Sequence, residues 1–439
     1  MSVMRLAALT TSLALLLLAC GGTTPPSAPP PSDGGPSPSE PVASAEAISG
    51  TVSLWYLEDP EFTFLPALKA EFEAANPGVT VEMTEIPEDG YVTKVDTAIL
   101  AGQPPDLGFI YEPRWMKAGS VLQLDDVIAA AGIDTSTFNQ AAFSECQLDG
   151  QTFCLGSLGG SVMLIYNKDL FDAAGVPYPS ASEPMTIDEY AALARRLAKP
   201  SDDPAKNVFG GTAEVPFWWT QRNTTFSEDG KAIAGVVNDE PTIHMYDVLA
   251  SMARDGTAPT AAQAEAMSSA DMLGAGAVAM AITDMEVGAS SLEAAGAKWG
   301  AAPVPVETAS DPGWVFTGTD KYGVFTQGPN QAAAKALIAF LGKEGSRIRV
   351  EASDDPPLDS TWLDDWAGDD PSRQEVASVM NLTAPIPLIP GFWDVTAPLG
   401  DGFSLIVAEE VTAADFLNEE APNMQDSLDQ AWETWDAIN

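Results

Sequence analysis

The sequence predicts an α/β protein of two domains. Short apolar segments with alternating polarity are interleaved with segments of helical apolar spacing, as expected when strands and helices alternate along a chain. About 390 of the 439 residues follow a proline-rich N-terminal segment, which is more than one hydrophobic core usually organises. These residues contain no apolar run long enough to span a bilayer as a helix.

The chain begins with what resembles a bacterial lipoprotein signal peptide, residues 1–19. Arg5 precedes an apolar run that is shorter than the ~20 residues of a membrane-spanning helix, and small residues and Cys20 follow it. The resemblance implies cleavage before Cys20 and acylation of that residue. The mature protein would then be extracytoplasmic and held at the bacterial cell membrane by lipid alone. An ordinary signal peptide with an incidental Cys20 is the alternative.

Residues 20–48 have the composition of a linker. Eight prolines lie between Gly21 and Ala45, together with Ser, Thr and Gly and no aromatic residue. Such a segment cannot bury enough apolar surface to fold, and its prolines keep it extended. We expect the folded part to begin near Ser49.

The first folded elements are predicted by apolar spacing. Leu65, Leu68 and Phe72 share one helical face, and Asn76 with the following Pro-Gly ends that helix. The strands are expected at residues 51–57, 79–83, 106–111 and 315–325. The helices are expected at residues 64–75, 92–101 and 331–341. This alternation favours parallel α/β units.

The charge of the chain excludes one class of partner. The chain has 63 acidic and 20 basic residues, for a formal net charge of −43. Nucleic acid binding needs a basic surface to neutralise phosphates, so we expect none.

Cys146 and Cys154 flank an Asp-Gly pair, which is typical of a two-residue hairpin turn. An extracytoplasmic compartment permits disulfides, so we predict a bridge that closes this hairpin. A metal site is the alternative, although no histidine or third thiol lies near in the sequence.

Several segments in the folded part carry a family resemblance. A Tyr-Asn-Lys-Asp-Leu-Phe stretch begins at Tyr166, and further segments follow the order of the family. The matching segments are residues 105–106, 119–126, 165–171, 174–177, 186–190, 277–282, 299–305 and 391–393. Together they resemble the extracellular solute-binding proteins of sugar ABC transporters (family 1), which are similar to maltodextrin-binding proteins.

The resemblance implies a type II periplasmic-binding-protein fold, with a ligand cleft between two lobes joined by hinge crossings. Lobe one would comprise residues 49–160 with 317–353, and lobe two residues 161–315 with 357–439. It also implies a monomer that binds a mono- or oligosaccharide and delivers it to the permease subunits of an ABC importer, without a cofactor or metal.

A sugar site needs aromatic planes for the ring faces and fixed polar groups for the hydroxyls. We therefore searched strand ends and the segments that match the family's contact loops. Lobe one offers Trp55, Tyr56, Glu58, Asp59, Tyr111 and Glu112. Lobe two offers Trp218, Trp219, Asp284, Glu286, Trp314 and Trp393. Trp393 matches the family's late aromatic contact and is the strongest candidate for stacking on a sugar.

Two other functions stay open. The many acids leave a cationic solute, such as a polyamine or amino sugar, as an alternative ligand. Paired acids such as Glu58 and Asp59 leave a glycoside hydrolase as a further alternative, although we expect no enzyme. His244, the single histidine, lies in a helical stretch and is expected on the surface or in packing.

Overall fold

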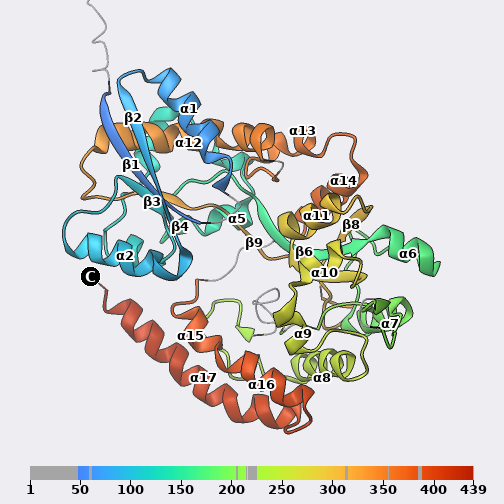
Figure 1. The fold of residues 1–439 in the computed structure, drawn as a ribbon. Helices are drawn as coiled ribbons and strands as arrows, with labels where there is room; N and C mark the ends of the chain where they lie inside the picture. Colours follow the sequence, from blue (N-terminus) through green and yellow to red (C-terminus); the bar gives the residue numbers. More distant parts are fainter. Residues whose placement is uncertain are drawn as a thin grey trace, which may run out of the picture. The chain divides into compact units, whose positions relative to one another are not determined.

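A computed structural model describes residues 48–58, 62–203, 206–213, 215, 225–311, 315–353, 355–383 and 388–438 (Figure 1). The signal peptide, Cys20 and nearly all of the linker lie outside these ranges. No helix in the described part of the chain is long and apolar enough to cross a membrane.

The first sheet has the order β10-β3-β1-β2. β1 runs parallel to β2 and β3, whereas β10 is antiparallel to β3. The strands are β1 (Gly50–Leu57), β2 (Val79–Ile86), β3 (Leu107–Phe109) and β10 (Tyr322–Val324). The helices around it are α1 (Leu65–Ala75), α2 (Glu88–Leu100), α3 (Pro113–Lys117), α4 (Asp125–Ala131), α5 (Gln140–Ser144) and α12 (Gln331–Ala352). The parallel units predicted for this part of the chain are present.

The single strand predicted at residues 315–325 is wrong. The structure has two short strands there, β9 (Thr317–Gly318) and β10, which belong to different sheets. Between them the Asp320 carboxylate accepts hydrogen bonds from the backbone amides of Ser157 and Leu158. The backbone therefore leaves one sheet and enters the other within a few residues, which apolar spacing does not reveal.

The second sheet has the order β7-β6-β8, with β9 also paired to β6, and all three pairings are antiparallel. Besides β9, its strands are β6 (Gly160–Asn167), β7 (Met280–Asp284) and β8 (Trp299–Ala302). The longer helices of this part are α7 (Ile187–Leu197), α8 (Glu240–Arg254), α11 (Met285–Ala294), α14 (Pro371–Met380), α16 (Pro398–Val407) and α17 (Ala413–Asp436). The shorter helices are α6 (Lys168–Ala174), α9 (Ala261–Ala266), α10 (Ser269–Gly274), α13 (Leu363–Ala367) and α15 (Phe392–Thr396). The predicted parallel arrangement does not hold here, because alternation of strands and helices leaves open at which end the chain re-enters the sheet.

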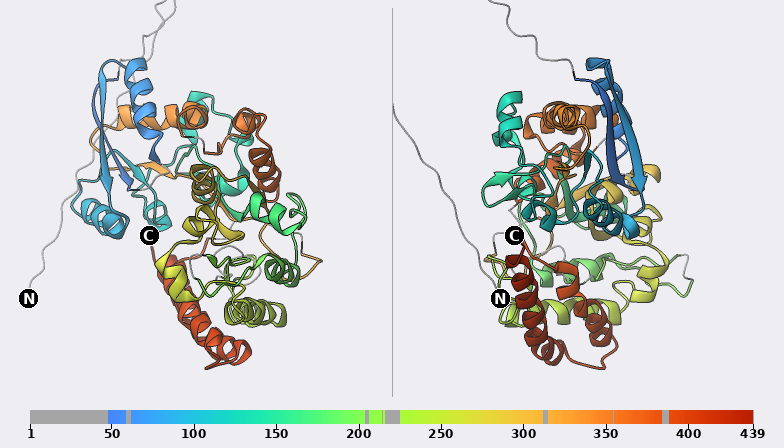
Figure 2. Two further views of the ribbon diagram at one scale, coloured as in Figure 1. Left: turned by 45° about the vertical axis from the view of Figure 1, so that its right-hand side comes forward. Right: turned by 90° about the vertical axis from the view of Figure 1, so that its left-hand side faces the viewer.

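Two separate hydrophobic cores correspond to the two sheets. The first core surrounds Phe72, Tyr91 and Ile338, and the second surrounds Tyr190 and Leu417. Figure 2 shows α16 and α17 side by side within the second group of elements. Within the described residues, the chain passes between the cores three times: between Leu155 and Val162, between Val315 and Tyr322, and between Ile348 and Trp366. On the third passage, Leu358 still packs on the first core, just beyond the predicted lobe boundary at residue 357.

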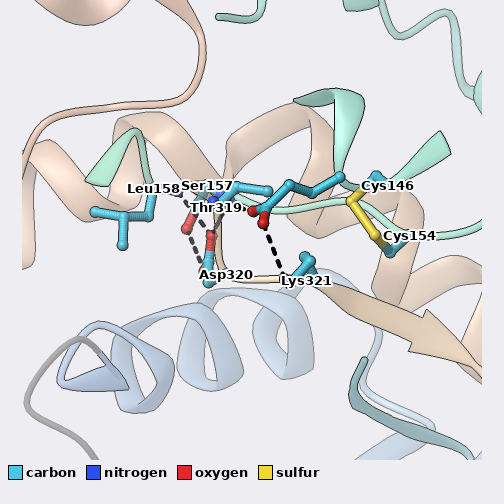
Figure 3. Close-up of a disulfide and its surroundings, with 8 residues drawn as sticks. Cys146, Cys154, Ser157, Leu158, Thr319, Asp320 and Lys321 are labelled. Atoms are coloured by element: carbon cyan, nitrogen blue, oxygen red, sulfur yellow. Dashed lines mark hydrogen bonds and ion pairs between the residues drawn. A yellow bond between two sulfur atoms is a disulfide. The ribbon is translucent and has the colours of Figure 1, made fainter. Parts of the chain in front are cut away.

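The hairpin between the cysteines is formed by β4 (Gln147–Leu148) and β5 (Gln151–Thr152). Its turn residues, Asp149 and Gly150, both have positive φ angles, 51° and 76°, as a primed turn requires. The sulfurs of Cys146 and Cys154 are bonded at 2.00 Å, and both residues are fully buried (Figure 3). The disulfide joins the end of α5 to the segment that leads out of the first core.

One carboxyl group of the second part makes stability depend on pH. Burial, with the nearby charges of Asp239 and Asp311, raises the pKa of Glu307 to about 7, while a hydrogen bond from the Thr242 hydroxyl opposes this shift. The folded state therefore binds more protons than the unfolded state between the ordinary pKa of 4.5 and about 7.

We expect the free energy of unfolding to fall by roughly 1–2 kcal/mol as the pH rises through that window, after allowance for partial solvent screening. Glu307→Gln should remove this fall, because the amide stays neutral. Thermal unfolding of both proteins between pH 4.5 and pH 8 measures it. Glu240→Gln, an exposed change at the start of α8, is the control and should keep the wild-type slope. An unchanged slope in Glu307→Gln would contradict the assignment.

Candidate functional site

The ends of β1 and β3 bring four predicted residues to one edge of the first sheet, because Trp55 pairs with Gly108 in the parallel ladder. Trp55 is half-buried, and the ammonium of Lys94 lies 4.7 Å from its ring centroid. Together with Asp89, Thr93 and further residues of α2, Trp55 lines a cavity of about 640 Å³. One face of the Trp55 indole is therefore covered by the Lys94 ammonium. The cavity beside the ring is lined by the charged side chain of Asp89 and the hydroxyl of Thr93.

Tyr56 lies on the opposite face of β1. Its ring makes an edge contact with Phe62 at 6.0 Å, and Phe62 in turn contacts Phe109 and Tyr322. Burial, followed by the charge of Glu85, raises the pKa of Tyr56. Both Trp55 and Tyr56 pack on the first core and are half-buried, so neither is a fully buried core residue.

Tyr111 follows β3 and is held by an acid from a neighbouring helix. Its hydroxyl donates to Glu88 Oε1 at 3.0 Å. Burial and the adjacent Glu88 carboxylate raise the pKa of Tyr111 to about 12, so the phenol stays protonated. Glu88 is the first residue of α2, directly after the end of β2, which places a carboxylate at the same edge.

Glu112 is held by an arginine network. Arg114 Nε lies 3.3 Å from Glu112 Oε2, and its two terminal nitrogens donate to both oxygens of Asp96 at 3.0 and 2.8 Å. The Trp115 indole nitrogen also donates to Asp96 at 2.8 Å, and Trp115 is buried. Such a fork fixes the guanidinium and hence the Glu112 carboxylate.

The described candidate residues of the second part lie on three elements. Asp284 ends β7 and is exposed, and Glu286 is in the first turn of α11. One Glu286 oxygen lies 3.6 Å from where a Cβ on Gly160 would stand, so this acid adjoins the first crossing. Trp393, on α15, is 62% exposed, and its ring makes an edge contact with Phe392 at 4.9 Å. Trp393 is therefore a surface aromatic residue and not part of the second core.

Of the remaining predicted site residues, the structure describes only Glu58, which is exposed just after β1. Asp59, Trp218, Trp219 and Trp314 lie outside the described residues. The sequence did not indicate Glu88, Lys94 and Arg114 as site residues. Glu88 and Lys94 lie on α2 and Arg114 lies on α3, and these helices reach the candidate residues only because β1, β2 and β3 are neighbours in the sheet. Acidic residues directly after a strand, such as Glu88, could have given the signal.

The described residues contain no group of three or more His, Cys, Asp or Glu side chains that could hold a metal ion. His244 is exposed on α8, and its Nε2 lies 3.2 Å from both oxygens of Asp188 on α7, far in sequence from the site candidates. This matches the expected surface role.

Comparisons with known proteins place the chain in a family. Residues 58–348 match the family described as bacterial extracellular solute-binding protein. A putative binding protein of Brucella abortus (strain 2308) is 26% identical over 298 residues, which cover 65% of this chain and 70% of the relative.

Solved structures agree in fold. An ABC substrate-binding protein from Listeria monocytogenes, in complex with cycloalternan, has a TM-score of 0.73 at 22% identity and covers 87% of this chain and 99% of its own. The GacH receptor of Streptomyces glaucescens, studied with acarbose, has a TM-score of 0.70 at 20% identity, with 88% and 99% covered. The maltose/maltodextrin-binding domain MalE from Bdellovibrio bacteriovorus, bound to maltotriose, has a TM-score of 0.67 at 19% identity, with 87% and 100% covered. The fold is therefore the predicted two-lobe periplasmic-binding-protein fold, and the chain belongs to the bacterial extracellular solute-binding proteins.

Proposed function

We propose that this protein is the lipid-anchored receptor of an ABC importer, that it acts as a monomer, and that its solute is a mono- or oligosaccharide. The main support is the combination of aromatic rings and fixed carboxylates at the strand ends of lobe one, with the exposed Trp393 on lobe two. The three structural relatives were solved in complex with cycloalternan, acarbose and maltotriose, and this favours an oligosaccharide as the solute.

The charge pairing in lobe one favours a neutral sugar over a cationic solute. Glu112 already faces Arg114, Glu88 accepts from Tyr111, and Lys94 covers one face of Trp55. A polyamine would have to displace these partners, whereas sugar hydroxyls can both donate and accept without removing them.

Thermal unfolding with maltotriose and with spermidine tests the proposal, because a ligand that binds only the native state raises the melting temperature. A shift with maltotriose alone supports the sugar receptor, and a shift with spermidine alone supports the cationic alternative. Chromatography of the same mixture must show intact maltotriose, since its hydrolysis would indicate a glycoside hydrolase instead. If neither probe binds, a wider panel of mono- and oligosaccharides decides whether the proposal stands.

We also propose the lobe limits given above, residues 49–160 with 317–353 and 161–315 with 357–439. The segregation of the two hydrophobic cores supports these limits except near residue 357, because Leu358 still packs on the first core.

The lipid anchor leads to a separate prediction. Cys20→Ser should leave the chain unacylated, because the acylated thiol is missing, and should release the protein from the membrane fraction of the producing cell. Fractionation followed by a salt wash measures this, with the wild-type chain as control. A variant that stays membrane-bound after the wash would overturn the lipid-anchor proposal.

A further inference from the structure

A buried guanidinium contacts all three passages between the lobes. Arg349 is on α12 and is fully buried. Its Nε donates to Ser157 Oγ at 2.9 Å, its Nη2 to Asp320 Oδ2 at 2.8 Å and its Nη1 to Asp355 Oδ2 at 2.8 Å. Ser157, Asp320 and Asp355 lie on the first, second and third passage, respectively.

The three partners are also bonded to one another. Asp320 Oδ1 accepts from the amides of Ser157 and Leu158 at 2.6 and 2.8 Å (Figure 3). The Ser157 carbonyl accepts from the amide of Leu358 on the third passage at 2.7 Å. Asp320 is as buried as Arg349, so water does not compete for these bonds.

The disulfide braces the same region. Glu145, next to Cys146, accepts from the amide of Thr319 at 3.2 Å and from the ammonium of Lys321 at 3.3 Å. Cys154 precedes Ser157 by a few residues. The ion pair thus ties the second passage to the residue beside Cys146, and the disulfide ties that residue's segment to the start of the first passage.

A glycine segment follows this network on the first passage. Gly159 and Gly160 come next, and a Cβ on Gly159 would lie 2.9 Å from the Pro357 carbonyl oxygen of the third passage. After them β6 and β9 pair through Gly160 and Gly318, where the second lobe begins. Glycine supplies backbone freedom between two rigid assemblies.

We propose that Arg349, Ser157, Asp320 and Asp355 form a fixed pivot that holds the lobe-one ends of the three passages as one body. The second lobe then rotates about the glycine segment, and the pivot limits the range of orientations that the lobes adopt before ligand binds. The inference concerns the ligand-free protein and does not depend on which solute it carries.

The experiment measures the distance distribution between spin labels on the two lobes without ligand. Leu100 on α2 and Val287 on α11 are 89% and 49% exposed and accept labels as cysteine substitutions in the full-length Cys20→Ser background, in which Cys146 and Cys154 stay bonded. Arg349→Lys keeps the charge but loses the fork, and we expect it to broaden the distribution. Hydrogen exchange at the Ser157 and Leu158 amides should accelerate by ~10-fold or more in the same variant.

Arg347→Met is the matched control. Arg347 lies two residues away on the same helix, and its ion pairs with Glu71, Glu344 and Glu351 all stay within lobe one. This variant should leave both the distribution and the exchange of the passages unchanged. A folded Arg349→Lys protein with the wild-type distribution would overturn the pivot, as would faster exchange spread evenly over the lobe-one core. Should Arg349→Lys fail to fold, Asp355→Ala is measured in its place. This variant removes only the contact of Arg349 with the third passage, the same broadening is expected, and an unchanged distribution counts equally against the pivot.

Discussion

Replacing Asp320 by alanine is expected to lower the free energy of unfolding by about 3–5 kcal/mol. The substitution removes the carboxylate that faces Arg349 in a fully buried environment, and it leaves the amides of Ser157 and Leu158 without their acceptor. Burial by itself would lower the pKa of Arg349, and the charges of Asp320 and Asp355 raise it instead. Without Asp320, the guanidinium loses a fully buried carboxylate partner, so a large part of its desolvation is no longer compensated.

Urea-induced unfolding of the two proteins measures this change. Asp255→Ala is a suitable control, because Asp255 pairs with Arg195 at 2.9 Å where both side chains are more than two-fifths exposed. Exposed pairs contribute about 0–1 kcal/mol, so this control should change little. A loss below about 1 kcal/mol for Asp320→Ala would mean that water enters the site and that the pair is not the buried contact described above.

The fold of lobe one could be predicted because its signals are local. Residues 64–75 show one apolar helical face, and the observed helix α1 (Leu65–Ala75) matches that range closely. The residues that join its elements were not predictable in the same way. Asp106 is buried and accepts hydrogen bonds from the amide and hydroxyl of Ser53 and from the amide of Asn330. These partners are far apart in the sequence, and one sequence contains no information on which of its 63 acids has such contacts.

The candidate site shows the same limit. Tyr111 and Glu112 could be named because they follow a strand, and strand ends share an edge in a parallel sheet. Their partners Glu88 and Arg114 depend on how α2 and α3 pack, and the role of Lys94 depends on the tilt of the Trp55 ring. Arg349 went unnoticed for a different reason: in the sequence it is one more cation in an amphipathic helix. Only its complete burial, which requires tertiary structure, sets it apart.

Trp393→Ala is expected to weaken binding of the solute by ~10-fold or more while leaving the free protein almost as stable as before. The ring is 62% exposed, and its described ring contact is an edge contact with Phe392, so little buried area is lost when it is removed. If a sugar ring stacks on this indole, the apolar contact exists only in the complex, and its loss lowers affinity without a matching loss of fold stability.

Titration calorimetry with maltotriose, or with the sugar that gives the largest thermal shift, measures the affinity, and thermal unfolding without ligand measures the stability. Trp366→Ala is the contrasting control, because Trp366 is only 3% exposed and packs in the second core. Its removal should destabilise the free protein by ~3–5 kcal/mol. If Trp393→Ala binds as tightly as the wild-type protein, the indole lies outside the site, and the proposed stacking surface must be sought among the other aromatic residues of lobe two. If it instead unfolds as readily as Trp366→Ala, the ring supports the fold, and its exposure has a structural and not a ligand-binding reason.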